Sequence, residues 1–116
     1  MGKNMDIPNY SSSNFAKNKP IHMNEFEKVF GRNAQLVVLE YLIRNRGTTT
    51  YLSGIAEETG LSHSSVARVI EPLLKQDMVK ESRVGKQIRT FTLNEDSEII
   101  RLLIRFYGDL EKIMGE

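Results

Sequence analysis

Apolar residues recur three and four positions apart between residues 24 and 76, a spacing typical of amphipathic helices. Four helices are predicted, over residues 24–31, 33–46, 53–60 and 62–76. A very short strand is predicted at 48–52, where β-branched and aromatic residues are adjacent. Asn33, Ser53 and Ser62 stand at the expected N-caps of the last three helices. Residues 24–76 are therefore predicted to be mainly helical.

The periodicity changes from helical to alternating beyond residue 77. Residues 78–84 and 87–93 alternate as strands do, and Gly85 with Lys86 forms the tip of a predicted hairpin. The inward side chains expected from this alternation are Val79, Phe91 and Leu93. The order of the elements predicts a mostly helical α+β fold.

A final helix is predicted over residues 95–114, capped by Asn94, with three acids near its start. Its four-three seam consists of Ile99, Leu103, Phe106, Leu110 and Ile113. Further apolar residues lie outside this seam, namely Ile100, Leu102, Ile104, Tyr107 and Met114. One small domain cannot bury so wide an apolar surface, so a homodimer through this helix is expected. The alternative is a monomer whose N-terminal helix covers the excess.

The composition is typical of one soluble domain, with 116 residues, 40% of them hydrophobic and 27% charged. No apolar run reaches the roughly 18 residues of a membrane span, and an apolar signal core is missing. The absence of cysteine excludes disulfides, thiolate metal sites and a cysteine nucleophile. A cytoplasmic protein is expected. Residues 1–22, rich in Asn, Ser, Lys and Pro, are expected to form a flexible tail.

The net charge is only +1, but the charges are unevenly distributed. Between residues 62 and 92, six basic residues stand against three acidic ones. These basic residues are Arg68, Lys75, Lys80, Arg83, Lys86 and Arg89. Acidic residues predominate after residue 94. A local basic zone favours a polyanionic partner more than the net charge of the whole chain indicates.

The segment SGIAEETGLSHSSVARVIEPLLKQ has the pattern of a helix-turn-helix. Ala56 lets the second helix cross closely over the first, Gly60 permits a positive φ in the turn, and Leu61 fills the gap between the helices. The exposed face of the second helix begins with His63, Ser64, Ser65 and Arg68. Short donors at a helix N-terminus meet phosphates, while longer side chains reach base edges. A plainer alternative is that the serines only cap and solvate the first turn.

Pro72 interrupts the second helix of this pair. It removes one backbone hydrogen bond, to the carbonyl of Arg68, and it crowds the preceding turn. We expect either a kink between residues 68 and 71 or a helix that is rigid only in its N-terminal half. The C-terminal half would then bend onto the core.

A basic hairpin directly after a helix-turn-helix is the winged form of the motif. The cationic or amide residues around its tip are Arg83, Lys86, Gln87 and Arg89. Such side chains reach a flanking minor groove or the DNA backbone. Each of them taken alone also fits a strand edge that is charged against aggregation.

Two stretches of the chain resemble the winged helix-turn-helix transcription regulators of the ArsR and MarR type, particularly the archaeal ones. They are VLEYLIRNRGTTTYLSGIAEETGLSHSSVARVIEPLLKQDMV and VGKQIRTFTLNEDSEI, within residues 25–114. The resemblance implies a winged helix-turn-helix fold and DNA binding. It assigns Ser64, Ser65 and Arg68 to the recognition helix, and Arg83, Lys86 and Arg89 to the wing. The chain departs from these regulators at two points. Asp77 stands where a glycine is usual before the first wing strand. The Cys and His clusters of the metal-sensing members are missing, so the resemblance implies no metal or cofactor.

The predicted function is a homodimeric, sequence-specific regulator that binds double-stranded DNA and represses transcription by occupying a promoter. It would be cytoplasmic and nucleoid-associated. Residues 23–93 would form the DNA-binding domain and residues 94–116 the dimerisation helix. The sequence identifies neither the operator nor a small-molecule effector.

An enzyme is the least supported class. His63 and the adjacent serines cannot form a catalytic triad, because neighbouring side chains diverge on a helix. A protein-interaction module without DNA readout is the main alternative, and it predicts apolar groups on the exposed helix face and on the wing. A third possibility is a regulator bound to another protein, with a secondary DNA role.

Overall fold

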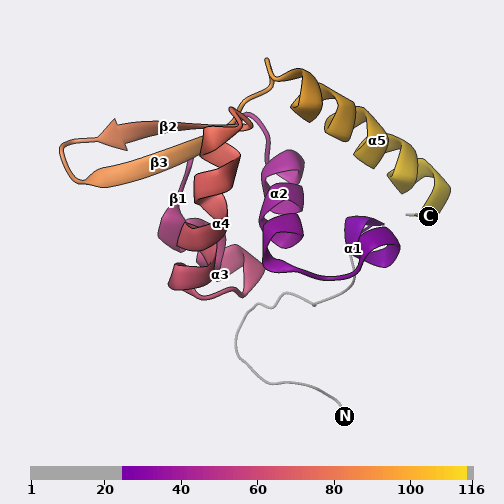
Figure 1. Ribbon diagram of the computed structural model, residues 1–116, viewed down its shortest axis with the longest axis horizontal. Coiled ribbons are helices and arrows are strands. Elements are labelled where there is room, and N and C mark those ends of the chain that lie inside the picture. The colour runs from indigo at the N-terminus through magenta and orange to yellow at the C-terminus, as the bar shows by residue number, and fades with distance from the viewer. Residues whose placement is uncertain (1–24, 115–116) are drawn as a thin grey trace, which may run out of the picture.

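The computed structural model describes residues 25–114, so the tail predicted at residues 1–22 lies outside the described part of the chain. Five helices and three strands follow one another in the order predicted (Figure 1). They are α1 (Glu25–Phe30), α2 (Ala34–Arg44), β1 (Thr50–Tyr51), α3 (Leu52–Thr59), α4 (His63–Lys75), β2 (Val79–Val84), β3 (Ile88–Leu93) and α5 (Glu98–Met114). The predicted α+β class is confirmed.

Local chemistry explains where α2 and α3 begin. Asn33 caps α2 as predicted, because its Oδ1 accepts a hydrogen bond from the Leu36 N–H at 2.8 Å. The predicted cap at Ser53 is wrong. The N-cap position lies two residues earlier, at Tyr51, which makes no side-chain hydrogen bond, and helix α3 begins at Leu52. The helix starts early because β1 leads into it directly, with no intervening loop.

Helix α4 has the predicted cap and includes Pro72. The Ser62 Oγ accepts a hydrogen bond from the Ser65 N–H at 3.1 Å. Helix α4 continues through Pro72 to Lys75, so Pro72 does not end the helix, and a kink between residues 68 and 71 or a less rigid C-terminal half stays a prediction. Ile70 and Leu73 flank the proline and are fully buried, and this packing offsets the lost backbone hydrogen bond.

The strands form one antiparallel sheet in the order β1-β3-β2. The hairpin register pairs Val84 with Ile88 across the predicted turn, and β1 pairs only with the inner end of β3. Asp77, before β2, has a φ of 60°, which is the left-handed conformation that aspartate can adopt. The Asn94 side chain donates to the Asp77 carbonyl at 2.7 Å and ties the end of β3 to this turn.

Helix α5 starts later than predicted, at Glu98. Its first turn is capped by Ser97, whose Oγ accepts from the Ile100 N–H at 3.3 Å. The prediction that Asn94 caps the helix is wrong, because its Oδ1 accepts from the Asp96 N–H in a local turn before α5 begins.

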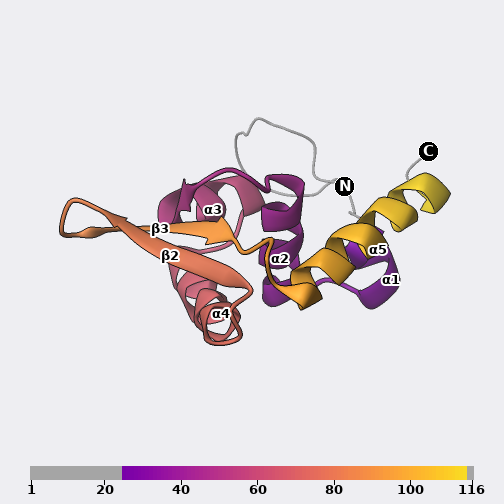
Figure 2. The ribbon, with the colours of Figure 1, turned by 90° about the horizontal axis from the view of Figure 1, so that it is seen from above.

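A single apolar core joins the helices to the inner half of the sheet. Its fully buried members include Phe26, Ile43, Ile55, Ile70 and Phe91. The inward positions predicted for the hairpin are confirmed, because Val79, Phe91 and Leu93 are all buried. Figure 2 shows α5 crossing α1 at the end of the molecule opposite the wing. Helices α2, α3 and α4 with the β2–β3 hairpin make a winged helix-turn-helix.

Candidate nucleic-acid interface

The start of α4 presents a polar face to solvent. Gly60 takes a φ of 80° and ends α3, and Leu61 packs against the core between the two helices. His63, Ser64 and Arg68 are exposed, while Ser65 is half-buried. Within residues 25–114, Arg68 has no hydrogen bond or ion pair, which leaves its guanidinium available to a ligand.

The serines at this end are partly engaged with one another. The Ser62 Oγ lies 3.2 Å from Ser64 Oγ and donates to Ser65 Oγ at 3.0 Å. The plainer alternative, in which these serines mainly organise the first turn, therefore describes part of what they do. Each hydroxyl keeps further hydrogen-bonding capacity, because a serine oxygen offers one donor and two acceptor sites.

The wing carries the remaining predicted side chains at its outer end. Lys86 and Gln87 lie in the turn and are exposed. Arg83 and Arg89 face each other one residue pair further in. Arg83 is 54% exposed, 3.7 Å from the Glu81 carboxylate, with a long hydrogen bond of 3.5 Å to the Lys86 carbonyl. The predicted wing residues therefore cluster at one end of the hairpin.

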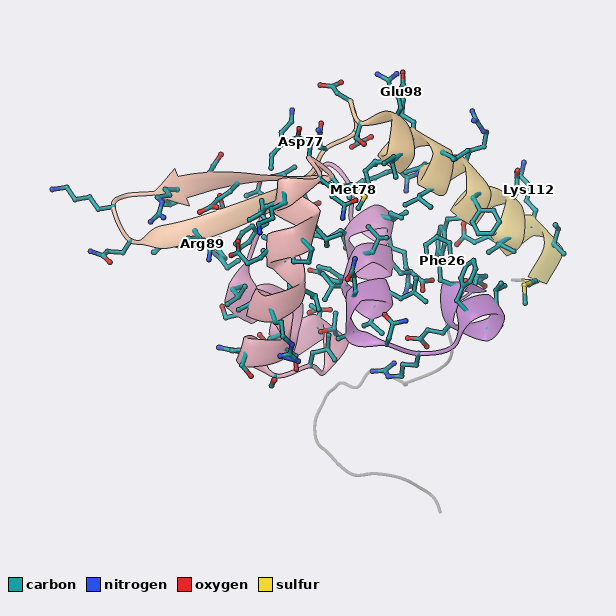
Figure 3. All side chains as sticks on the ribbon, in the orientation of Figure 1. Phe26, Asp77, Met78, Arg89, Glu98 and Lys112 are labelled. Atoms are coloured by element: carbon teal, nitrogen blue, oxygen red, sulfur yellow. The ribbon has the colours of Figure 1, made fainter. Side chains whose placement is uncertain are left out.

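Arg89 is engaged far more closely than Arg83. Its Nε donates to Glu81 at 2.8 Å and its Nη2 donates to Glu71 of α4 at 3.1 Å. The bonds to Glu81 and then to Glu71 raise the pKa of Arg89, and Arg89 in turn lowers the pKa of Glu81. In Figure 3 the labelled Arg89 lies beneath the wing, towards α4.

A cleft of about 550 Å³ separates the outer wing from the starts of α3 and α4. Its lining residues are Tyr51, Leu52, Ser53, His63, Gln87, Ile88 and Arg89. Three predicted site residues, His63, Gln87 and Arg89, are brought together here across two segments of the chain. Tyr51, Ser53 and Ile88 were not predicted as site residues, because the pairing of β1 with β3 that brings residues 51–53 beside the wing joins distant parts of the chain.

The predicted seam of α5 divides into inward and outward residues. Leu103 and Leu110 pack against the protein's own core, whereas Ile99, Phe106 and Ile113 are exposed by 49%, 37% and 76%. The residues that α5 buries most deeply are Ile100 and Tyr107, both outside the predicted seam. Three of the five seam residues, Ile99, Phe106 and Ile113, are therefore exposed, and the other two pack inward.

Helix α1 extends this apolar surface. Val29 and Phe30 are 46% and 58% exposed, and the rings of Phe30 and Phe106 lie 6.2 Å apart between centroids. We call the exposed apolar residues of the two helices the α1–α5 face; they are Val29, Phe30, Ile99, Leu102, Phe106, Ile113 and Met114. Helix α1 therefore covers part of α5, because Phe26 packs against Phe106 and Tyr107, and it also adds exposed apolar side chains of its own.

Glu40 is a buried acid beneath this face that the sequence analysis missed. Its side chain is fully buried on α2, and neither carboxylate oxygen has a hydrogen-bond partner. Burial raises the pKa of Glu40 to about 7, with a smaller upward contribution from Glu27, while Tyr107 and Arg44 act in the opposite direction. Burial of Tyr107, beside the Glu40 charge, raises its own pKa as well. The sequence did hold a sign of this burial, because Glu40 lies at helical spacing between the apolar residues Leu36 and Ile43.

Within residues 25–114 no cluster of His, Cys, Asp and Glu could hold a metal ion. No helix in that same range is long and apolar enough to cross a membrane.

No family model matches the chain, and no curated protein matches it significantly. Solved structures do resemble it. NolR from Sinorhizobium fredii aligns with a TM-score of 0.56 at 21% identity, covering 78% of this chain and 82% of NolR. MepR, a transcription regulator of the Staphylococcus aureus multidrug efflux pump MepA, aligns with a TM-score of 0.56 at 13% identity, covering 78% of this chain and 67% of MepR.

A third similar structure is a ZitR variant from Lactococcus lactis in complex with DNA. It aligns with a TM-score of 0.50 at 17% identity and covers 63% of this chain. The chain spans about half of ZitR, 51% of its length. At these identities the likeness shows the fold alone, which is that of winged helix-turn-helix proteins.

Proposed function

We propose that the protein is a homodimeric transcription regulator that binds double-stranded DNA sequence-specifically and represses by occupying its site. The observation that carries this proposal is the shared cleft, because His63 at the start of α4 and Gln87 in the wing turn line the same concave surface. One segment of DNA would then contact both elements. MepR is described as a transcription regulator, and the ZitR structure holds DNA, which supports this choice.

The proposed contacts follow from the reach and charge of each side chain. Arg68, exposed and unpaired within the described residues, would read base edges in the major groove. His63, Ser64 and Ser65 would meet phosphates or bases near the helix start. The outer wing would contact the minor groove or backbone through Arg83, Lys86 and Gln87. Arg89, also predicted as a DNA contact, differs from Arg83 because two carboxylates, those of Glu71 and Glu81, bind it.

The proposed dimer uses the α1–α5 face. Two copies packed through this face would present two copies of α4 to successive major grooves, about 34 Å apart. The face is apolar and lies on the far side of the molecule from the wing, so dimer formation would leave both cleft and wing free. Dimerisation would also remove exposed aromatic surface from water. A cytoplasmic, nucleoid-associated location without catalytic activity fits this role.

The protein-interaction module is the second candidate, and two residues favour it. Val84 and Ile88 on the wing are apolar and 51% and 49% exposed. A partner protein could cover both of them. The start of α4, in contrast, exposes His63, Ser64 and Arg68 rather than apolar groups, so the DNA proposal accounts for more of the surface.

Binding to duplex DNA over a series of salt concentrations tests the proposal. Fluorescence anisotropy with mixed-sequence duplexes should show affinity that falls steeply with salt, because lysine and arginine displace counterions. Arg68→Ala with Lys86→Ala should weaken binding, whereas Lys75→Ala, at the far end of α4, should leave it unchanged. Absence of binding to any duplex at low salt would favour the protein-interaction module.

A further inference from the structure

Two arginines face each other in the wing and differ sharply in their surroundings. Arg83 is exposed and loosely paired, whereas Arg89 is 33% exposed and held by two carboxylates. We infer that Arg89 is a positioning residue, which fixes the wing against α4 and does not contact DNA itself. The part of this inference that concerns DNA affinity rests on the proposed function. The part that concerns the wing does not.

The contacts of Arg89 join three elements. Its Nε and Nη2 donate to the two oxygens of Glu81 on β2, at 2.8 and 3.2 Å. Its Nη2 also donates to Glu71 on α4 at 3.1 Å. The guanidinium carbon lies 5.1 Å from the ring centroid of Phe91, which is fully buried. A forked bond to one carboxylate with a ring beneath it is a geometry that only arginine offers.

The bridge made by Arg89 lies where the hairpin leaves the three-stranded part of the sheet, so it can affect the direction of the outer wing. Strand β1 pairs only with Phe91 and Thr90, so the hairpin beyond Thr90 has no third strand. A two-stranded ribbon is marginally stable by itself in water. Arg89 is the first residue of β3 beyond the three-stranded part, and it ties the ribbon to the middle of α4. Its bridge would therefore set the direction of the outer wing and the width of the cleft.

The local charge also argues against direct phosphate contact. Glu81 also lies 3.7 Å from Arg83, so the group formed by Arg83, Arg89, Glu71 and Glu81 has two positive and two negative charges and a net charge of zero. Such a group does not attract a phosphate. Lys86, in the turn, has no acidic partner among the described residues and suits that contact better.

A DNA-binding role and a positioning role for Arg89 predict opposite changes in DNA affinity when the carboxylate of Glu71 or Glu81 is removed. If Arg89 were a DNA ligand held back by its partners, Glu71→Gln or Glu81→Gln would free it and strengthen DNA binding. If Arg89 positions the wing, both substitutions weaken binding, although each removes a negative charge near the proposed DNA path. General electrostatics would give the first result, so the second is specific to positioning.

Wing mobility in the free protein gives the most direct test. The chain has no cysteine, so spin labels at Val84→Cys on the wing and Glu58→Cys on α3 report one distance by pulsed electron paramagnetic resonance. In this background we expect a narrow distribution, which broadens in Arg89→Ala and in Arg89→Lys. Arg83→Ala is the matched control, at the same level of the same hairpin, and should leave the distribution narrow. An unchanged distribution in Arg89→Ala would overturn the inference.

DNA binding gives the second readout. Arg89→Ala should weaken affinity about fivefold without changing the salt slope, whereas Arg83→Ala should lower that slope by about 1. A lowered slope in Arg89→Ala would make Arg89 a phosphate ligand and overturn the inference. If the unmodified protein binds no duplex, the proposed function fails, and the distance distributions still decide the role of Arg89. If Arg89→Ala does not fold, Glu71→Gln in the labelled protein decides it.

Discussion

The two ends of the molecule differ in how far their charged groups are paired and their apolar side chains are buried. At the wing end, the carboxylates of Glu71 and Glu81 are paired with Arg89, and the start of α4 is polar. At the other end, the α1–α5 face exposes Phe30 and Ile113, and the buried Glu40 carboxylate beneath it has no hydrogen-bond partner. The wing end suits a hydrated, charged ligand. The α1–α5 end has exposed apolar surface and a buried acid whose charge Tyr107 and Arg44 offset only in part, so that protonation is favoured.

The largest expected effect comes from placing charge on the α1–α5 face. Phe30→Glu with Ile113→Glu should abolish the proposed dimer, because both side chains are more than half exposed and would be desolvated in a dimer. DNA affinity should then fall by roughly 100-fold, since two linked recognition helices gain from effective concentration. Sedimentation and DNA titration measure the two results.

Gln35→Glu is the control for this double variant. It adds a negative charge at an exposed position of α2 outside the α1–α5 face and should remain dimeric. If the wild-type protein is monomeric and still binds DNA tightly, the α1–α5 face is not a dimer interface that DNA binding requires.

The next effect concerns the pH dependence of stability. The pKa of Glu40 is raised in the folded state from 4.5 to about 7, so the folded protein binds this proton more tightly than the unfolded chain does. The stabilisation is fully present below about pH 4.5 and is lost as the pH rises through about 7. Its size follows from the shift and is about 3 kcal/mol.

Glu40→Gln tests this account by denaturant unfolding at several pH values. The variant should lose the decrease in the free energy of unfolding between pH 5 and pH 8 that the wild type shows. Glu111→Gln, which removes an exposed acid from α5, should keep that decrease. Identical pH profiles for Glu40→Gln and the wild type would show that Glu40 has a stabilising partner.

At the wing end, a smaller effect is expected from Arg68→Ala. Loss of a base contact should cost about 1–3 kcal/mol for the preferred duplex and much less for unrelated sequences. Competition between a selected duplex and random duplexes measures the change in preference. Equal weakening on both would reassign Arg68 to the phosphate backbone.

The smallest effect is expected at the tip of the wing. Lys86→Ala should weaken binding to all duplexes by a similar factor and lower the salt slope by about 1, because one phosphate contact is lost. Lys75→Ala supplies the control. A slope that stays the same would remove Lys86 from the proposed contacts.

Much of the fold could be predicted because its determinants are local. The cap at Ser62, the positive φ of Gly60 and the left-handed Asp77 each follow from a few neighbouring residues. Where two polar residues could cap the same helix, the neighbouring residues alone did not predict which of them does. Asn94 and Ser97 both precede α5, and the chain path out of β3 places Ser97 at the cap.

The environment of the site residues was harder to predict, because it depends on contacts between distant segments. Glu71 and Arg89 are 18 residues apart, and only the packing of the sheet against α4 brings them together. The burial of Tyr107 on α5 depends likewise on where α1 and α2 pack. The sequence therefore predicted which side chains are candidates for DNA contact, but not which of them are already engaged.

Selection of bound duplexes from a random pool tests the central claim most directly. A homodimer with one α4 in each of two successive major grooves should enrich an inverted repeat whose half-site centres are about 10 base pairs apart. Phe30→Glu with Ile113→Glu should lose that spacing. Enrichment of no sequence at low salt, with the wild-type protein folded, would contradict the claim that this winged helix reads DNA.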